Sequence, residues 1–105
     1  MQLSFRAWDV LGKEYQVTIE KVGFDKAVIF INDRRYDVSN LEKNMLGTIV
    51  KGKVNGSDMS LHVIWHSQRP FFTLNLAGSS TYYFNVLDCL NFVSWIQAET
   101  MTIVK

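Results

Sequence analysis

The chain has little cysteine, little proline and almost no net charge, and each shortage excludes a class of protein. Its 105 residues include a single cysteine, Cys89, so an intramolecular disulfide and a disulfide-stapled secreted scaffold are not indicated. One proline and six glycines, with no low-complexity stretch, mark no linker, so we expect a single domain over residues 1–105. Eleven basic and ten acidic residues give a net charge of +1, which offers no electrostatic footprint for nucleic acid or anionic lipid.

Segments that direct a chain to or across a membrane are also missing. The first residues contain no basic stretch followed by an apolar one, so no signal peptide is predicted. The longest apolar run falls far short of the roughly 20 residues that a membrane-spanning helix needs. With its lone thiol, the chain fits a reducing compartment. We therefore expect a soluble cytoplasmic protein, or one of the mitochondrial matrix in a eukaryote.

Alternation of apolar and polar residues is the strongest pattern present, and it predicts β-strands. It runs through residues 3–8, 15–20, 35–38 and 59–66. Residues 27–31 are a continuous apolar run that also predicts a strand, and further strands are predicted at residues 48–54, 71–76 and 81–87. Turn signals separate these segments, among them Gly12, Asn32-Asp33 and above all Asn55-Gly56, a typical hairpin dipeptide. The sequence thus predicts a mainly β fold, a small antiparallel barrel or sandwich of seven or eight strands with one short helix near the C-terminus.

The helix is predicted for residues 88–98. Cys89, Phe92 and Ile96 have the spacing of one helix face, and Asp88 is the expected N-cap. A strand is the alternative there, because Phe and Val are strand formers. Residues 100–104 are either a last strand or a frayed end. An exposed final strand could pair with a second copy, so a homodimer is one expectation.

A second helical signal is shorter. Ser39-Asn40-Leu41-Glu42 matches a capping box and predicts one helical turn, which Gly47 would end at once.

Groups with catalytic or metal-binding potential are few. His62 and His66 have the spacing of a helical metal site, but on a strand they lie about 13 Å apart at roughly 3.3 Å per residue, too far for one zinc ion. The sequence has no nucleophile-elbow serine, no glycine-rich phosphate loop and no evident carboxylate pair. Cys89 is expected to be a small buried hydrophobe. We therefore predict a protein that is not an enzyme and that has no catalytic residue, cofactor or metal.

The chain has fourteen aromatic residues, seven Phe, four Tyr and three Trp, and most are expected to fill the core. Those at polar strand positions or beside turns are candidates for an exposed patch that binds another protein. Lys51, Lys53 and the Arg34-Arg35 pair are too few for the basic groove that single-stranded nucleic acid requires. On expected exposure alone, the predicted partner-binding residues are Trp8, Arg34, Arg35, Trp65, His66 and Arg69.

From residue 14 to residue 90, the order of strands and turns is similar to that of a known family. The matching segments are Tyr15-Gln16-Val17-Thr18-Ile19, residues 27–31, Asn32-Asp33-Arg34-Arg35-Tyr36-Asp37-Val38, Val50-Lys51-Gly52-Lys53-Val54-Asn55-Gly56, Leu61-His62-Val63-Ile64-Trp65-His66, Leu76-Ala77-Gly78-Ser79, Tyr83-Phe84-Asn85-Val86 and Leu87-Asp88-Cys89-Leu90. They resemble the subunit-bridging (BT) β-barrel domain in the α subunit of biotin-dependent acyl-CoA carboxylases of the methylcrotonyl-CoA and propionyl-CoA type. The resemblance implies a non-catalytic domain that docks onto the carboxyltransferase β subunit. The chain has no Met-Lys-Met motif, so it cannot carry biotin at the usual site.

Other binding functions stay open. The chain could be a stand-alone inhibitor or accessory factor that acts through an exposed aromatic patch or a sheet edge. A closed barrel could also enclose a small apolar ligand.

Overall fold

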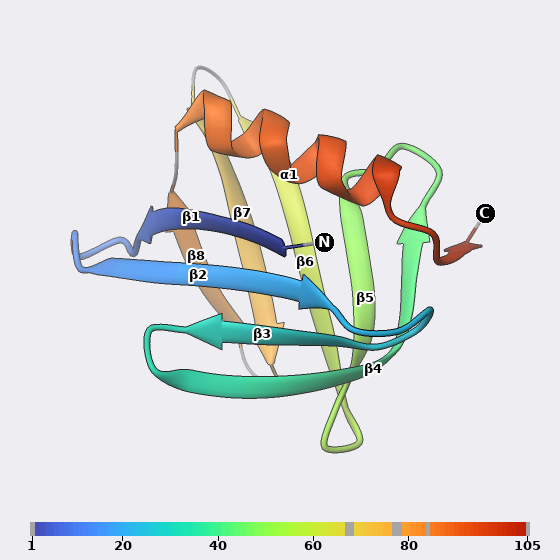
Figure 1. The fold of residues 1–105 in the computed structure, drawn as a ribbon. Helices are drawn as coiled ribbons and strands as arrows, with labels where there is room; N and C mark the ends of the chain where they lie inside the picture. The colour runs from blue at the N-terminus through green and yellow to red at the C-terminus, as the bar shows by residue number, and fades with distance from the viewer. Residues whose placement is uncertain (1, 67–68, 77–78, 84, 105) are drawn as a thin grey trace.

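In the computed structural model, residues 2–66, 69–76, 79–83 and 85–104 are described. For residues 65, 66, 69–72, 74–76, 79–82 and 86 this description covers the backbone and not the side chain. Within these ranges the chain forms nine β-strands and one α-helix (Figure 1). They are β1 (Gln2–Trp8), β2 (Glu14–Lys21), β3 (Ala27–Ile31), β4 (Arg34–Asn44), β5 (Ile49–Val54), β6 (Ser57–His66), β7 (Arg69–Leu76), β8 (Ser79–Tyr83), α1 (Val86–Ala98) and β9 (Thr102–Val104).

The first eight strands form an antiparallel meander that curls until its last strand meets its first. Each strand pairs with the next along the chain, and Trp8 of β1 lies opposite Tyr83 of β8. The short β9 adds to β4 in parallel. The prediction of a mainly β, barrel-like antiparallel fold with one short helix near the C-terminus is confirmed. For residues 100–104 we expected a strand or a frayed end, and the structure has the strand β9 there.

Two of the predicted turns have the backbone that their sequences demand. Asn32, in the β3–β4 turn, has φ of 54°, and Asn55 and Gly56, in the β5–β6 turn, have φ of 51° and 81°. The two consecutive left-handed residues of the β5–β6 turn are those of a type I′ hairpin loop, which Asn-Gly tolerates best. These turns set the register of the strands on either side.

The helical turn predicted at residues 39–42 is wrong, because this segment lies within β4. The register with β5 shifts between Ser39 and Glu42, which marks a β-bulge, and Asn40 adopts a left-handed φ of 55°. The N–H of Leu41 donates to the carbonyl oxygen of Asp25 at 2.9 Å instead of to β5. The extra residue lets β4 bend from its pairing with β3 to its pairing with β5. Tertiary pairing therefore overrides the local capping signal.

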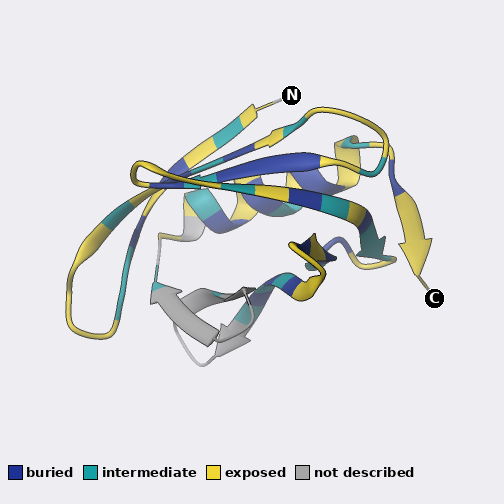
Figure 2. Cartoon of the chain, turned by 90° about the horizontal axis from the view of Figure 1, so that it is seen from below, coloured by how far each residue is buried: buried dark blue, intermediate teal, exposed yellow. Residues whose placement is uncertain are grey.

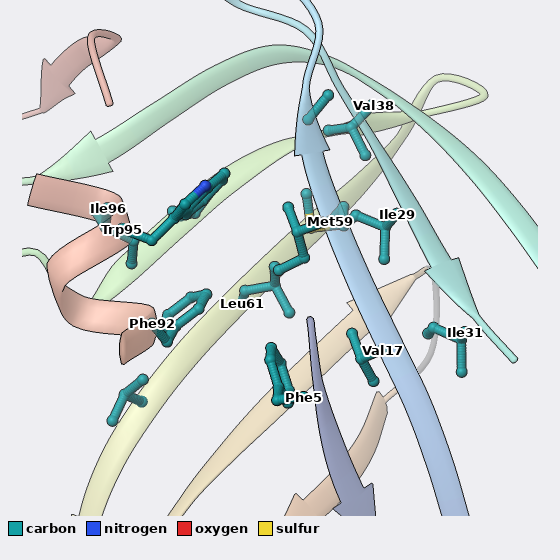
Figure 3. Packing of buried hydrophobic residues seen from close by; sticks show 14 of the residues in the cluster. Phe5, Val17, Ile29, Ile31, Val38, Met59, Leu61, Phe92, Trp95 and Ile96 are labelled. Atoms are coloured by element: carbon teal, nitrogen blue, oxygen red, sulfur yellow. The ribbon is translucent and has the colours of Figure 1, made fainter. Parts of the chain in front are cut away.

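Helix α1 packs one face against the interior of the curled sheet. The side chains of Phe92, Trp95 and Ile96 are at most 4% exposed and belong to the same buried cluster as Met59 and Leu61 of β6. Figure 3 shows these helix residues directed toward the side chains of the sheet. In Figure 2 the exposed residues gather in the loops and along β9.

The helical interpretation of residues 88–98 is confirmed and its strand alternative is wrong, but the cap was misplaced. Asn85 is the N-cap, and its side-chain oxygen accepts a hydrogen bond from the N–H of Asp88 at 2.7 Å. Asp88 therefore lies in the first helical turn, where its negative charge favours the helix.

Candidate functional site

The loop between β1 and β2 is short and densely hydrogen-bonded. The N–H of Asp9 donates to the carbonyl of Lys13, and the N–H of Gly12 donates to the carbonyl of Asp9, each at 3.0 Å. The Asp9 carboxylate also accepts bonds from the N–H groups of Leu11 and Lys13, both at 2.9 Å, and from the hydroxyl of Tyr15 at 3.1 Å. Gly12, at φ of +84°, makes the tight reversal possible. The tip of this hairpin therefore has one fixed backbone conformation.

These bonds also act on the charge of Asp9. The backbone N–H of Lys13 holds the pKa of this carboxyl below its usual value of 3.8, with further help from the N–H of Leu11 and the hydroxyl of Tyr15. Asp9 is therefore a carboxylate at neutral pH, which is the form that accepts all three bonds.

The fixed tip presents two adjacent apolar side chains to solvent. Val10 is 70% exposed and Leu11 is 90% exposed, the largest fraction among the exposed large hydrophobic residues that the structure describes. Scattered exposed hydrophobic residues are common on protein surfaces. Val10 and Leu11 differ from such scattered residues because they are adjacent and lie on a loop whose backbone is hydrogen-bonded to Asp9. Binding another surface through this loop therefore costs little conformational entropy.

The β3–β4 turn lies against strand β2, at Gln16, four residues along the chain from Gly12 of the tip. The N–H of Asn32 donates to the carbonyl of Gln16 at 2.8 Å, and the N–H of Gln16 donates to the side-chain oxygen of Asn32 at 2.9 Å. Both hairpins project at the left of Figure 1. Arg34 and Arg35, two of the predicted contact residues, begin β4 directly after this turn, and both are exposed.

Each arginine of this hairpin is held in place by its neighbours. The guanidinium of Arg34 lies 5.9 Å from the ring centroid of Tyr36. Arg35 donates to the carboxylate of Asp37 at 3.0 Å and lies 6.0 Å from the ring centroid of Phe30. These exposed contacts contribute little to stability, but they limit the positions of both cations.

Trp8, the third predicted contact residue at this end, is half-buried where β1 meets β8. It lines a shallow hollow of about 440 Å³ together with Ser4, Phe5, Arg6, Gln16, Asn85 and Asp88. Burial raises the pKa of Asp88, while its hydrogen bond from Asn85 and the charge of Arg6 act in the opposite direction. The hollow is polar and open, and its lining does not include Val10 or Leu11.

The remaining three predicted contact residues fall on the β6–β7 hairpin. Trp65 lies opposite Pro70, and His66 lies opposite Arg69. The side chains of Trp65, His66 and Arg69 lie outside the described residues, so the structure places only their backbone. The six predicted residues therefore fall on three hairpins: Trp8 on β1–β2, Arg34 and Arg35 on β3–β4, and the other three on β6–β7.

A larger concavity of about 460 Å³ lies over β4, β5 and β6. It is lined by Asn40, Glu42, Lys51, Gly52, Lys53, Asp58, Met59 and Ser60. Its charges compensate one another: Lys53 forms an ion pair with Asp58, and Glu42 lies opposite Lys51 on the neighbouring strand. The hydrogen bond from Lys53, together with its charge, lowers the pKa of Asp58. This balance gives a phosphate or carboxylate ligand no surplus of positive charge.

Cys89 is fully buried, as predicted, and burial raises the pKa of its thiol to about 12. The sulfur is therefore a thiol and not a nucleophilic thiolate at neutral pH.

His62 and His66 lie on strand β6, as the alternation predicted. In the described part of the chain, no three His, Cys, Asp or Glu residues are grouped so that they could hold a metal ion. None of the described segments is a helix of the length and hydropathy needed to span a bilayer.

Sequence reasoning missed the hairpin tip. Turns are normally polar, so Val10 and Leu11 between Asp9 and Gly12 were a detectable anomaly. The aspartate two residues before Leu11 is the usual signal of an Asx turn, in which the side chain accepts a hydrogen bond from the backbone N–H two residues further on.

Comparisons with family models, with curated proteins and with solved structures found no match.

Proposed function

We propose that this chain is a non-catalytic protein-docking domain that inserts Val10 and Leu11 into an apolar pocket of a partner protein. The observation that carries the proposal is the pair of side chains, 70% and 90% exposed, on a loop fixed by five hydrogen bonds around Asp9. Binding modules concentrate their affinity in a few apolar or aromatic anchors that fill pockets.

The fixed loop makes this an efficient anchor. Burying one leucine or valine side chain contributes about 1.5–3 kcal/mol. A flexible loop would lose part of that gain to ordering, whereas the β1–β2 tip is already ordered. In this proposal the exposed Arg34 and Arg35 of the neighbouring hairpin belong to the polar rim of the interface, and the half-buried Trp8, which precedes Asp9, lies at its edge.

The partner that the sequence resemblance suggests is the carboxyltransferase β subunit of a biotin-dependent carboxylase. An eight-strand meander with a helix packed against its interior supports this choice, since a bridging barrel needs a rigid body between its contacts. We propose this subunit as the first partner to test.

The test is a binding titration of the purified chain against the carboxyltransferase subunit of the same organism. Leu11→Asp is expected to weaken binding at least tenfold, which corresponds to about 1.4 kcal/mol. Leu87→Asp is the matched control: Leu87 is 65% exposed on helix α1, and the same charge there leaves the hairpin untouched. Thermal melts of both variants show whether each is folded.

Two results would overturn parts of the proposal. Binding that Leu11→Asp and Leu87→Asp leave equally strong would remove the hairpin tip as the anchor. If the carboxyltransferase does not bind the wild-type chain, the carboxylase assignment fails. Retention of another purified protein, sensitive to Leu11→Asp, would then support a stand-alone accessory factor.

A further inference from the structure

The two-residue loop between β5 and β6 is the dipeptide Asn55-Gly56, which has a chemistry of its own besides its role as a turn. An asparagine before a glycine is prone to lose its side-chain amide. The backbone nitrogen of the glycine attacks the side-chain carbonyl carbon, and no Cβ atom on the glycine hinders this approach. In a folded chain, the reaction depends on whether the two reacting groups are held in other contacts.

Both reacting groups of Asn55-Gly56 are unengaged in the part of the chain that the structure describes. Neither the side chain of Asn55 nor the N–H of Gly56 makes a hydrogen bond there. Both residues are exposed, and Figure 1 shows their loop at the lower end of the molecule, beyond the ends of β5 and β6. A Cβ atom on Gly56 would meet nothing within 4 Å, so this glycine faces open space.

The other asparagines whose side chains the structure describes each have one of the two groups engaged. In three of them the side-chain oxygen accepts a backbone N–H at 2.7–2.9 Å: Asn32, Asn44 and Asn85. After Asn40, it is the attacking nitrogen that is held, because the N–H of Leu41 donates to the carbonyl of Asp25 at 2.9 Å. Asn91 lies inside helix α1, where the next N–H belongs to the helical hydrogen-bond ladder.

We propose that Asn55 is a site of spontaneous deamidation, with water as the co-reactant. The nitrogen of Gly56 attacks Cγ of Asn55 and loses its proton to water, and the side-chain amide leaves as ammonia. The product is a cyclic succinimide. Water then adds to one of its two carbonyl groups and opens the ring. Opening at the side-chain carbonyl gives aspartate, and opening at the main-chain carbonyl gives isoaspartate. Overall, one water is consumed and one ammonia is released, with no change of oxidation state.

The two products change the hairpin differently. Either one adds a carboxylate, so the net charge of the chain falls by one, from +1 to zero. Aspartate keeps the main chain intact, and Asp-Gly is also a preferred type I′ loop. Isoaspartate adds a carbon to the main chain between Val54 and Ser57, which lie opposite each other in the ladder. Only isoaspartate therefore disturbs the turn that sets the register of β5 and β6.

This inference is independent of the proposed docking function. It rests on the β5–β6 loop and not on the β1–β2 tip, and its test needs no partner protein.

The test is peptide mapping by mass spectrometry after long incubation of the folded 105-residue chain in mildly alkaline buffer. The method measures conversion separately at each asparagine. We expect Asn55 to convert at least about tenfold faster than Asn32, Asn40 or Asn44. Asn55→Gly is the matched control, because Gly-Gly also forms a type I′ loop but has no amide to lose. Isoelectric focusing should show the acidic form in the wild type and much less of it in this variant.

A second variant separates the effect of the fold from that of the dipeptide. Asp33→Gly gives the chain another Asn-Gly pair, in the β3–β4 loop, where φ of Asn32 is 54° and so matches the 51° of Asn55. The side chain of Asn32 is held by the N–H of Gln16, whereas that of Asn55 is not. In the folded variant, Asn55 should convert at least about tenfold faster than Asn32. In urea, both should convert at similar rates.

Two outcomes contradict the inference. If Asn55 converts in urea but stays intact in the folded chain, the hairpin protects it. If Asn32 and Asn55 convert equally fast in folded Asp33→Gly, the hydrogen bond of the side chain has no influence. Thermal melts show whether each variant is folded.

The effect on the turn has its own measurement. The isoaspartate form, separated by chromatography, should melt at a lower temperature than fresh Asn55→Asp, which has the same charge and a normal main chain. Equal melting temperatures would contradict the predicted disturbance of the hairpin.

Discussion

The ammonium group of Lys43 on β4 donates a hydrogen bond to the carbonyl oxygen of Ile96 in the last turn of helix α1, at 2.8 Å. The same nitrogen donates to the carbonyl of Glu99, just beyond the helix, at 2.7 Å. Helix α1 has no basic residue in its own last turn. A strand residue thus supplies the positive charge that the C-terminal end of a helix favours. The contact also fixes the segment that leads from the helix into β9.

Replacing Lys43 by methionine should destabilise the fold. The substitution keeps the length of the side chain but leaves two half-buried carbonyl groups without their charged donor, which costs about 1.5–3 kcal/mol. Urea unfolding of Lys43→Met measures the loss. Lys26→Met is the control, because Lys26 is exposed. Equal losses in the two variants would mean that Lys43 has no special role at the helix end.

The fold was predictable from the sequence where its causes are local. Alternation identified the strands, and Asn32 and Asn55-Gly56 identified turns because their side chains tolerate left-handed backbone. The bulge at Asn40 was not predictable. The segment carries a real capping signal, and only its pairing with β3 and β5 decides against a helix.

The site was less predictable, because its parts are joined by contacts that no spacing rule encodes. Trp8, Arg34 and Arg35 were predicted as contact residues from their expected exposure, and in the structure they lie toward one end of the molecule. It passed over Leu11, since hydrophobic residues were assigned to the core by default. The contact between Lys43 and Ile96 joins residues 53 positions apart, and no local pattern indicates it.

Acid should loosen the β1–β2 tip before it affects the neighbouring hairpin. The N–H of Lys13 lowers the pKa of Asp9 in the folded state below 3.8. The stabilising effect of the carboxylate is therefore complete above the unfolded value and is lost as the pH falls through the lower, folded pKa. Amide hydrogen exchange, followed by NMR through the acid range, should show falling protection at Leu11 and Lys13.

The amide of Gln16 is an internal control for this experiment. Its acceptor is the side-chain oxygen of Asn32, which does not titrate. Protection at Gln16 should therefore persist at pH values where Leu11 and Lys13 have lost theirs. If all three amides lost protection together, the acid effect would be global unfolding and not the release of Asp9.

Cys89 should be unreactive in the folded protein. Its side chain is fully buried and the pKa of its thiol is about 12, so little thiolate forms at pH 8 and no reagent reaches it. Ellman's reagent should detect almost no thiol in native protein and one thiol per chain in denaturant. In native buffer, the slow labelling rate should follow the opening of the fold, and it should rise in Lys43→Met. Rapid labelling of the native protein would show that Cys89 is accessible.

Adding a methyl group at Gly52 should destabilise the protein, although alanine usually stabilises a strand relative to glycine. A Cβ there would lie 2.5 Å from Cγ1 of Val38 and 2.9 Å from the carbonyl oxygen of Ser39, where β4 bends over β5. We expect Gly52→Ala to cost about 1–3 kcal/mol, as overpacking does. Gly23→Ala is the control: its Cβ meets only Cβ of Lys26 at 3.7 Å, so it should be neutral or stabilise by about 0.4–1 kcal/mol.

The double variant Gly52→Ala/Val38→Ala separates the two causes of this cost. Val38→Ala removes the methyl groups that the new Cβ would contact, but the carbonyl of Ser39 is backbone and moves only if the bulge moves. The second substitution should therefore cost less in the Gly52→Ala background than in the wild type, without restoring wild-type stability. Urea unfolding of the four proteins gives this coupling. Strict additivity would show that Val38 yields freely, and that the cost of Gly52→Ala comes from the backbone carbonyl of Ser39.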